Sequence, residues 1–207
     1  MTLELKNIGK KFNKDWIFRN INYTFNYNNV YAITGFNGSG KSTLLQIISG
    51  FVIPTEGQII YSNTANDNIN LVNDDVAFKN ISVTAPYVEL IEEMTATEFL
   101  MFHQQFKSFI NNIAIAEILN IVQLSTSANK QIRYFSSGMK QRLKLAQAFF
   151  SNTTVLLLDE PCSNLDKTGI ELYLQLIKNY TQNRLVIICS NDEVEYAFCN
   201  YELHLSV

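Results

Sequence analysis

Residues 35–43 read GFNGSGKST, which matches the phosphate-binding pattern G-x-x-x-x-G-K-[ST]. Glycine adopts positive φ values without strain, so successive backbone N–H groups can converge on the α- and β-phosphates of a nucleotide. Lys41 is placed to reach the β- and γ-phosphates, and the Ser42 hydroxyl is placed to bind Mg²⁺. The stretch therefore predicts a nucleoside triphosphate site. The residues expected to contact the nucleotide through this loop are Gly35, Asn37, Gly38, Ser39, Gly40, Lys41, Ser42 and Thr43.

The sequence on both sides of this loop has the pattern that a phosphate loop requires. Apolar residues 30–34 precede it and predict a strand, whereas apolar residues recur at helical spacing from 44 to 48. The helix would direct its positive N-terminal end at the phosphates and end at Gly50, a residue suited to a left-handed cap. A chance glycine-rich turn does not explain this context.

The composition indicates a folded globular protein in a reducing compartment. The chain has 207 residues, of which 47% are hydrophobic, and this fits a single domain with an ample core. Nineteen acidic against sixteen basic residues give a net charge of −3, so we expect no nucleic-acid partner. The three cysteines lack metal-ligand spacing. The longest aliphatic runs, such as 155–158, are far shorter than a membrane span, and we expect a cytoplasmic location.

The first third of the chain is predicted to be rich in β-strands. Residues 2–6 and 17–25 alternate apolar and polar side chains, and residues 58–61 follow a turn. Phe12 and Trp16 lie between the first two strands, where either ring is a candidate to stack on adenine, and core packing is as good an explanation for each. Residues 62–80 are crowded with Asn and Asp, which favours irregular loops with at most one short strand.

A small helical lobe is predicted in the middle of the chain. A strand at 81–84 precedes the Thr95-x-x-Glu98 spacing, which is typical of a capping box at a helix start. A second helix is expected around 115–122. Four phenylalanines at helical spacing are expected to form the core of the lobe: Phe99, Phe102, Phe106 and Phe109.

The last third returns to alternating strands and helices. Small residues in the segment 133–142 lead into a helix whose N-terminus can bind an anion. Residues 155–161 read VLLLDEP, an aliphatic strand that ends in Asp159 and Glu160, as expected for a buried parallel strand with chemistry at its carboxyl end. A loop at 163–166, a helix at 169–180 and strands at 184–190 and 201–205 complete the chain.

Over essentially its full length the chain resembles the ATP-binding subunit of ABC transporters. Four motifs stand in the order of that family: GFNGSGKST, then FSSGM at 135–139, VLLLDEP, and SNLD at 163–166. The resemblance implies an α/β fold with a P-loop NTPase core on a mostly parallel sheet, an N-terminal antiparallel β subdomain and an inserted small helical lobe. It implies one domain, 1–207, with the core in 1–86 and 136–207 and the lobe in about 87–135.

The resemblance also implies roles and partners. Two subunits, identical or different, would enclose Mg²⁺ and ATP head to tail, with Ser136 and Gly138 of one subunit covering the γ-phosphate bound by the other. Asp159 would hold Mg²⁺, and Glu160 would be the general base. A transmembrane permease in a separate chain would hold the subunit at the inner face of the membrane.

Two positions depart from the family pattern. The glutamine that usually contacts Mg²⁺ is replaced at the best-aligned position by Tyr87, and Glu89 is the other candidate. The usual switch histidine is Asn191, whose amide can donate a hydrogen bond to phosphate but cannot carry a proton. These departures keep a second interpretation open, a weakly hydrolysing ATP-dependent switch on a partner complex, beside the leading one, an ATPase that drives a transporter. An ABC-type protein acting on DNA or ribosomes ranks last, since such relatives carry coiled coils or two cassettes.

Overall fold

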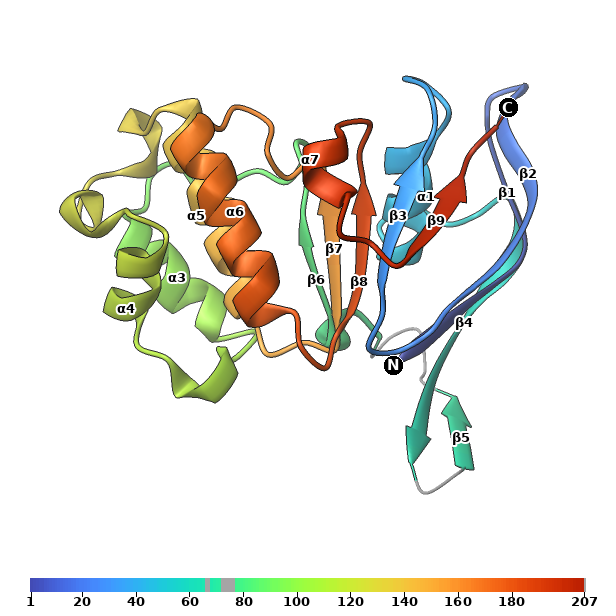
Figure 1. Cartoon of the computed structure of the whole chain (residues 1–207), viewed down its shortest axis with the longest axis horizontal. Coiled ribbons are helices and arrows are strands. Elements are labelled where there is room, and N and C mark those ends of the chain that lie inside the picture. Colours follow the sequence, from blue (N-terminus) through green and yellow to red (C-terminus); the bar gives the residue numbers. More distant parts are fainter. Residues whose placement is uncertain (66–67, 72–76, 207) are drawn as a thin grey trace.

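The computed structural model describes residues 1–65, 68–71 and 77–206. In this part of the chain an antiparallel sheet, a parallel sheet and a group of helices lie in succession along the longest axis of the molecule (Figure 1). This arrangement confirms the α/β fold class, including the N-terminal antiparallel part.

The antiparallel sheet has the strand order β2-β1-β4-β5. Its strands are β1 (Thr2–Phe12), β2 (Asp15–Phe25), β4 (Glu56–Ala65) and β5 (Asn68–Leu71). β1 and β2 are longer than predicted, because Asn7 and Asn20 adopt positive φ and the register shifts between β1 and β2, which interrupts the alternation that marks a strand. Gly57 is required in β4, since a Cβ there would lie 2.3 Å from the backbone oxygen of Lys6.

The segment 62–80 is more regular than expected. β4 continues to Ala65 and pairs with β5, and a short 3-10 helix, η1 (Phe78–Asn80), follows. The prediction of irregular loops was wrong for residues 62–65, because pairing with a neighbouring strand outweighs the turn preference of Asn and Asp, whereas β5 is the one short strand that the prediction allowed. At residues 66–67 and 72–76 the prediction lies outside the described residues.

The parallel sheet positions the candidate site. Its order is β6-β7-β8-β3-β9, formed by β3 (Val30–Thr34), β6 (Ile81–Thr84), β7 (Val155–Asp159), β8 (Leu185–Cys189) and β9 (Tyr201–His204). Because the carboxyl ends of parallel strands share one edge, the segments that follow β3, β7 and β8 meet there. These segments carry the phosphate loop, Glu160 and Asn191.

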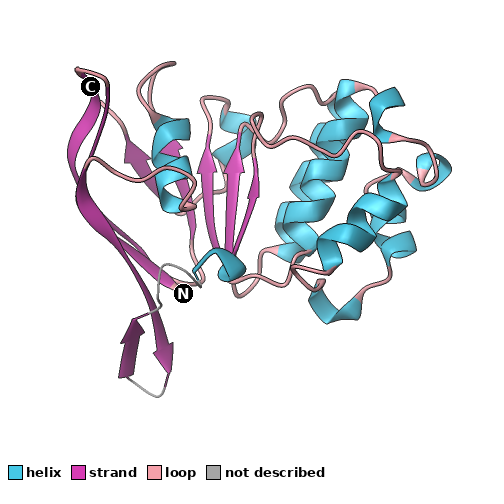
Figure 2. Cartoon of the chain, turned by 180° about the vertical axis from the view of Figure 1, so that it is seen from behind, coloured by secondary structure: helices cyan, strands magenta, loops and turns pink. Residues whose placement is uncertain are grey.

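Helices cover both faces of this sheet (Figure 2). Val155 and Leu157 face one core, shared with α1 (Lys41–Ile48) and the antiparallel sheet. Leu156 and Leu158 face the other core, with α5 (Ser137–Phe150) and α6 (Lys167–Tyr180). Side chains of a strand alternate between its faces, so an unbroken aliphatic run is what a strand buried on both sides needs. The short helix α7 (Glu193–Tyr196) follows β8.

The helical lobe contains α3 (Ala96–Gln104) and α4 (Ile115–Ile121), joined and followed by the short turns η2 (Ile110–Asn112), η3 (Ser125–Ser127) and η4 (Ile132–Tyr134). Thr95 forms the predicted capping box with Glu98. The expected phenylalanine core was wrong in part: Phe99 and Phe109 are buried, whereas Phe102 is 43% and Phe106 69% exposed. The helix ends at Gln104, so the helical spacing does not extend to Phe106, and Phe102 lies on the solvent side.

Candidate nucleotide site

The loop between β3 and α1 has the backbone that a phosphate cradle needs. Gly35, Gly38 and Gly40 have positive φ. Gly40 cannot be replaced without movement, because a Cβ there would lie 2.5 Å from Ile17. The Lys41 ammonium donates to the backbone oxygens of Gly35 (2.7 Å) and Phe36 (3.3 Å). A cavity of about 290 Å³ opens over this loop, lined by Ile17, Asn37, Gly38, Gly40, Lys41, Ser42, Thr43 and Glu160.

Polar atoms at this edge of the sheet are buried without partners. The Ser39 hydroxyl and both carboxylate oxygens of Asp159 accept no hydrogen bond of normal geometry from the described residues. Burial raises the pKa of Asp159 to about 6, the Glu160 charge adds to the rise, and the nearby Ser42 hydroxyl and Lys41 oppose it. Such orphaned polar atoms are costly in a folded chain. The Asp159 oxygens, which lie near the Ser42 hydroxyl, fit a site that takes a cation.

The described residues contain no group of three or more His, Cys, Asp or Glu side chains that could hold a metal. Mg²⁺ usually takes one or two protein oxygens and completes its shell with waters and phosphate.

Glu160 follows β7 in an unusual backbone conformation. Its φ is +45°, a value that residues other than glycine adopt only when the surroundings hold them there. Its N–H donates to Cys189 of β8 (2.9 Å), and its carbonyl accepts from Ser163 (3.0 Å). The side chain is exposed and lines the cavity over the phosphate loop.

The switch position lies beside the phosphate loop. Asn191 is exposed after β8, and its side-chain amide donates to the side chain of Asn37 (2.8 Å). The sequence patterns of the two strands had not indicated this contact between the loops after β3 and β8.

The two candidates for the missing glutamine lie in different surroundings. Burial raises the pKa of the Tyr87 phenol far above its usual value, and the nearby Asp159 charge adds to this, while a hydrogen bond with Gln46 of α1 opposes it. Tyr87 is therefore near Asp159. Glu89 instead lines a separate cavity of about 430 Å³, together with Lys140 and Lys144 of α5.

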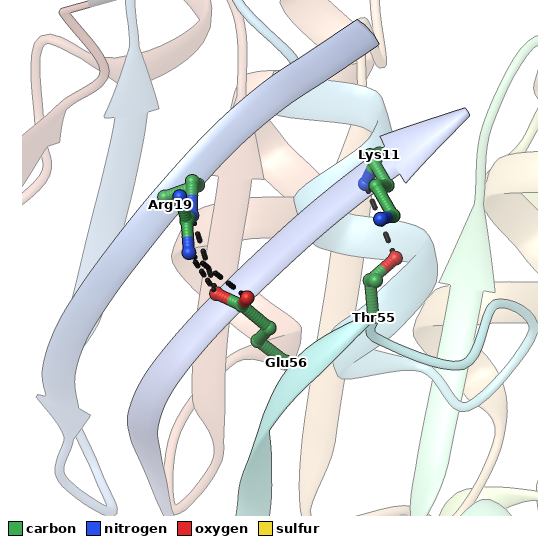
Figure 3. Close-up of polar contacts among 4 residues, drawn as sticks. All are labelled: Lys11, Arg19, Thr55 and Glu56. Carbon is green, nitrogen blue, oxygen red and sulfur yellow. Dashed lines mark hydrogen bonds and ion pairs between the residues drawn. The ribbon is translucent and has the colours of Figure 1, made fainter. Parts of the chain in front are cut away.

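The two aromatic candidates for adenine also differ. The face of the Trp16 ring is covered by the Arg19 guanidinium, 4.1 Å from the ring centroid. Glu56 holds Arg19 by hydrogen bonds of 2.9–3.2 Å, and the neighbouring Lys11 backbone donates to Thr55 (Figure 3). Phe12 is 49% exposed at the end of β1, with the Lys10 ammonium 4.9 Å from its ring.

The FSSGM segment begins α5 away from this cavity. Ser136 caps the helix, accepting from the Met139 N–H (3.2 Å). A Cβ on Gly138 would lie 3.1 Å from the Asn164 carbonyl, so this segment packs on the SNLD loop. Neither Ser136 nor Gly138 lines the cavity over the phosphate loop.

Sequence reasoning missed three residues around the site. Ile17 lines the cavity, although the sequence marks it only as a strand residue. Gln141 and Glu195 are buried and bind the backbone just after Glu160. Both look like ordinary polar helix positions in the sequence, because the burial that gives them meaning is tertiary.

A phosphate loop after the third strand, paired carboxylates after a buried parallel strand and an inserted helical lobe define a P-loop ATPase of the cassette type. Comparison with known proteins agrees. The chain belongs to the ABC transporter family, whose profile matches residues 18–163.

Individual relatives span nearly the whole chain. The uncharacterized ABC transporter ATP-binding protein YybJ of Bacillus subtilis (strain 168) is 30% identical over 207 residues, covering 99% of this chain and 92% of the relative. The lantibiotic transport ATP-binding protein SrtF of Streptococcus pyogenes is 30% identical, and the match covers 94% of this chain and 82% of that relative. The post-hydrolysis structure of the ATP-binding cassette MJ0796, a dimer bound to ADP and Pi, matches with a TM-score of 0.81 at 26% identity over 99% of this chain and 94% of that one.

The chain is thus an ATP-binding subunit of an ABC transporter, and it hydrolyses ATP. Within residues 1–65, 68–71 and 77–206, none of the helices combines the length and apolar character needed to cross a membrane.

Proposed function

We propose that the cavity over residues 35–43 binds the triphosphate of ATP with Mg²⁺. The observation that carries this proposal is the loop that lines the cavity, in which Gly38 and Gly40 have positive φ and the Lys41 ammonium is held by the backbone oxygens of Gly35 and Phe36. The N–H groups of Gly38 and Gly40 would bind phosphate oxygens, and Lys41 would exchange its backbone acceptors for the β- and γ-phosphates.

Ser42 and Asp159 would hold Mg²⁺, Asp159 through the water shell of the ion. Bound there, Mg²⁺ supplies positive charge against the β- and γ-phosphates. Tyr87 is favoured over Glu89 as the third residue in contact with Mg²⁺. The Asp159 charge is among the causes that raise the pKa of Tyr87, whereas Glu89 lies near Lys144. Asp159 must be ionised to do this, which is consistent with a neutral working pH above its pKa of about 6.

Glu160 would be the general base that orients and polarises the attacking water. It lines the phosphate cavity and its carboxylate is exposed to solvent, so water can reach it. Asn191 would orient the γ-phosphate: its side-chain nitrogen carries two N–H groups, of which the contact with Asn37 uses one. Phe12 would stack on adenine, since the face of Trp16 is covered by Arg19.

The position of the signature segment supports head-to-tail dimerisation. Ser136 and Gly138 stand at a helix N-terminus suited to phosphate, but they do not line the phosphate cavity of their own chain. A second copy, or a related subunit, would bring its α5 over that cavity. The solved MJ0796 cassette is itself described as dimeric.

Trapping the dimer tests this proposal. Glu160→Gln keeps the shape of the side chain but removes the base, so we expect this variant to elute as a dimer with Mg²⁺-ATP and as a monomer with Mg²⁺-ADP. Ser136→Ala added to Glu160→Gln serves as the matched control and should weaken the dimer. A monomer at every protein concentration in Mg²⁺-ATP would refute the arrangement.

A transmembrane permease in another chain would complete the transporter and hold this subunit at the inner face of the membrane. Within the single domain that we propose, with a lobe at about 87–135 inserted between 1–86 and 136–207, the exposed Ile91, Phe102 and Phe106 offer an apolar surface for a short permease helix. The acidic residues beside this surface would attract a basic partner only weakly, because Glu92 pairs with Lys140 and Glu93 with Arg133.

A slow ATP-dependent switch is the second candidate function. The observation that favours it is the Asn191 contact with Asn37, which places a neutral amide at the position of a proton-carrying histidine. Turnover decides between the two: a wild-type rate no higher than that of Glu160→Gln would identify a switch, and a clearly higher rate would identify a motor.

A further inference from the structure

The turn that carries Glu160 is held by four hydrogen bonds, one within the turn and three to other parts of the fold. The Glu160 N–H donates to Cys189, and the Glu160 carbonyl accepts from Ser163. The next carbonyl, that of Pro161, accepts from the buried Gln141 side chain of α5 (2.7 Å). The next N–H, that of Cys162, donates to the Glu195 carboxylate of α7 (2.6 Å). Two of the four partners are therefore buried side chains.

Glu195 is an unusual residue to bury. It is 4% exposed, and its second carboxylate oxygen accepts no hydrogen bond of normal geometry from the described residues. Burial raises the pKa of Glu195, which the nearby Ser190 hydroxyl and the Cys162 N–H partly oppose. The Tyr173 hydroxyl of α6 donates to the Glu195 carbonyl (2.8 Å), which fixes the backbone beneath the carboxylate. An aliphatic side chain would fill the same space without the desolvation penalty.

We infer that Glu195 is a positioning residue for hydrolysis: by holding the Cys162 N–H it keeps the turn after β7 in the conformation that aims Glu160 at the phosphate cavity. The inference rests on the proposed role of Glu160 as the base. Glu160 needs this support because its positive φ persists only where neighbouring contacts impose it. A small misplacement of a catalytic group is enough to slow the reaction strongly.

The same contact joins two loops of the site. Cys162 follows β7, and Glu195 lies on α7, four residues after Asn191 in the segment that follows β8. Asn191 in turn contacts Asn37 of the phosphate loop. The segment 190–195 therefore contacts both the phosphate loop and the turn that carries Glu160. Glu195 makes the contact with that turn.

Two isosteric variants test the inference. Glu195→Gln keeps an oxygen that can accept from Cys162, whereas Glu195→Met keeps the length but has no comparable acceptor. We expect Glu195→Met to lower kcat by about tenfold to a hundredfold with KM and ATP affinity unchanged. Glu195→Gln should retain about half of the wild-type kcat or more. Glu193→Ala, an exposed change on the same helix, is the matched control and should leave kcat unchanged.

Unfolding in urea separates positioning from stability. Glu195→Met removes a buried carboxylate but also leaves the Cys162 N–H without its acceptor, and these two effects on stability oppose each other, so its urea midpoint should stay close to that of the wild type while its turnover falls. A Glu195→Met protein with wild-type kcat overturns the inference. So does one that unfolds, or whose ATP affinity falls in step with its rate, and so does an equal loss of kcat in the glutamine variant.

A double variant distinguishes this inference from the role of Glu160. If Glu195 acts through Glu160, adding Glu195→Met to Glu160→Gln should not lower the residual single-turnover rate further. An additive loss would mean that Glu195 acts on something else. If Glu160→Gln alone hydrolyses ATP at the wild-type rate, the assignment of Glu160 as the base is wrong. The effect of Glu195→Met on kcat is measured in a protein with wild-type Glu160, so it tests the Glu195 inference separately.

Discussion

Replacing Asp159 by asparagine should stabilise the nucleotide-free protein while removing its response to Mg²⁺-ATP. Asp159 is 1% exposed and its carboxylate oxygens lack normal hydrogen bonds from the described residues. Its pKa rises from an ordinary value of 3.8 to about 6, chiefly through burial. Since one pKa unit corresponds to about 1.4 kcal/mol, keeping this carboxylate ionised lowers the free energy of unfolding by roughly 3 kcal/mol at neutral pH.

The ionisation penalty of the buried Asp159 carboxylate depends on pH. Below an ordinary pKa of 3.8 the carboxyl is protonated in both the folded and the unfolded chain, so its burial has no ionisation penalty. The penalty grows as the pH rises from 3.8 to about 6 and is complete above that. Asp159→Asn should therefore gain up to about 3 kcal/mol over wild type at pH 7.5, less what an unpartnered amide costs, and almost nothing at pH 4.

Urea unfolding with EDTA and without nucleotide, at pH 4, 6 and 7.5, measures this difference. Asp15→Asn, an exposed carboxylate replaced in the same way, is the control and should show no such trend. With Mg²⁺-ATP the wild type should gain stability and Asp159→Asn should gain much less, because the metal contact is lost. A variant that is less stable than wild type at pH 7.5, or a difference that does not change with pH, refutes the reasoning.

Further predictions concern adenine stacking, the phosphate contacts, the switch position Asn191 and the permease partner. Phe12→Ala should weaken ATP binding in calorimetry by about 1–2 kcal/mol while Trp16→Ala leaves it unchanged, and the reverse order would move the stacking role to Trp16. Lys41→Ala should lose one or more charge-assisted hydrogen bonds of about 1.5–3 kcal/mol each, and unchanged affinity would exclude the phosphate cradle. At saturating Mg²⁺-ATP, where the bound cation keeps Asp159 ionised, the wild-type rate should show no inflection between about pH 6 and 8, whereas Asn191→His should add one near pH 6.5; a wild-type inflection there would show that another group titrates. Crosslinks from Glu92 should reach the permease in assembled complexes, and crosslinks from the far end of the domain alone would place docking elsewhere.

Local sequence patterns predicted most of the fold because each depends on neighbours in the chain. The phosphate loop needs glycines at fixed spacing, and Gly35, Gly38 and Gly40 all have the positive φ that this spacing implies. The Thr95 capping box is likewise complete within four residues. The aliphatic run at 155–158 predicted a strand buried on both faces, because no polar side chain interrupts it.

Tertiary contacts decided what sequence could not. The helical spacing of the four phenylalanines treats the segment as one helix, but the helix ends before Phe106. The choice between Phe12 and Trp16 depends on Arg19, three residues after Trp16 on β2, and on Glu56 of β4, which holds the Arg19 guanidinium. Tyr87 and Glu89 are two residues apart, yet they point into different surroundings. For these two pairs of candidates the sequence named the residues, and the partner across the fold that separates them was unknown.

Asn191, which replaces the usual switch histidine, changes which groups must supply positive charge to the phosphate. A neutral amide brings no positive charge to the phosphate, so the field in this chain must come from Lys41, from Mg²⁺ and from the helix that begins at Ser136 of a second subunit. Two of these three sources are present only when ATP and a partner are bound. A chain that lacks a charged switch residue is for this reason more dependent on closure of the dimer, and its rate in the monomeric state should lie close to that of Glu160→Gln.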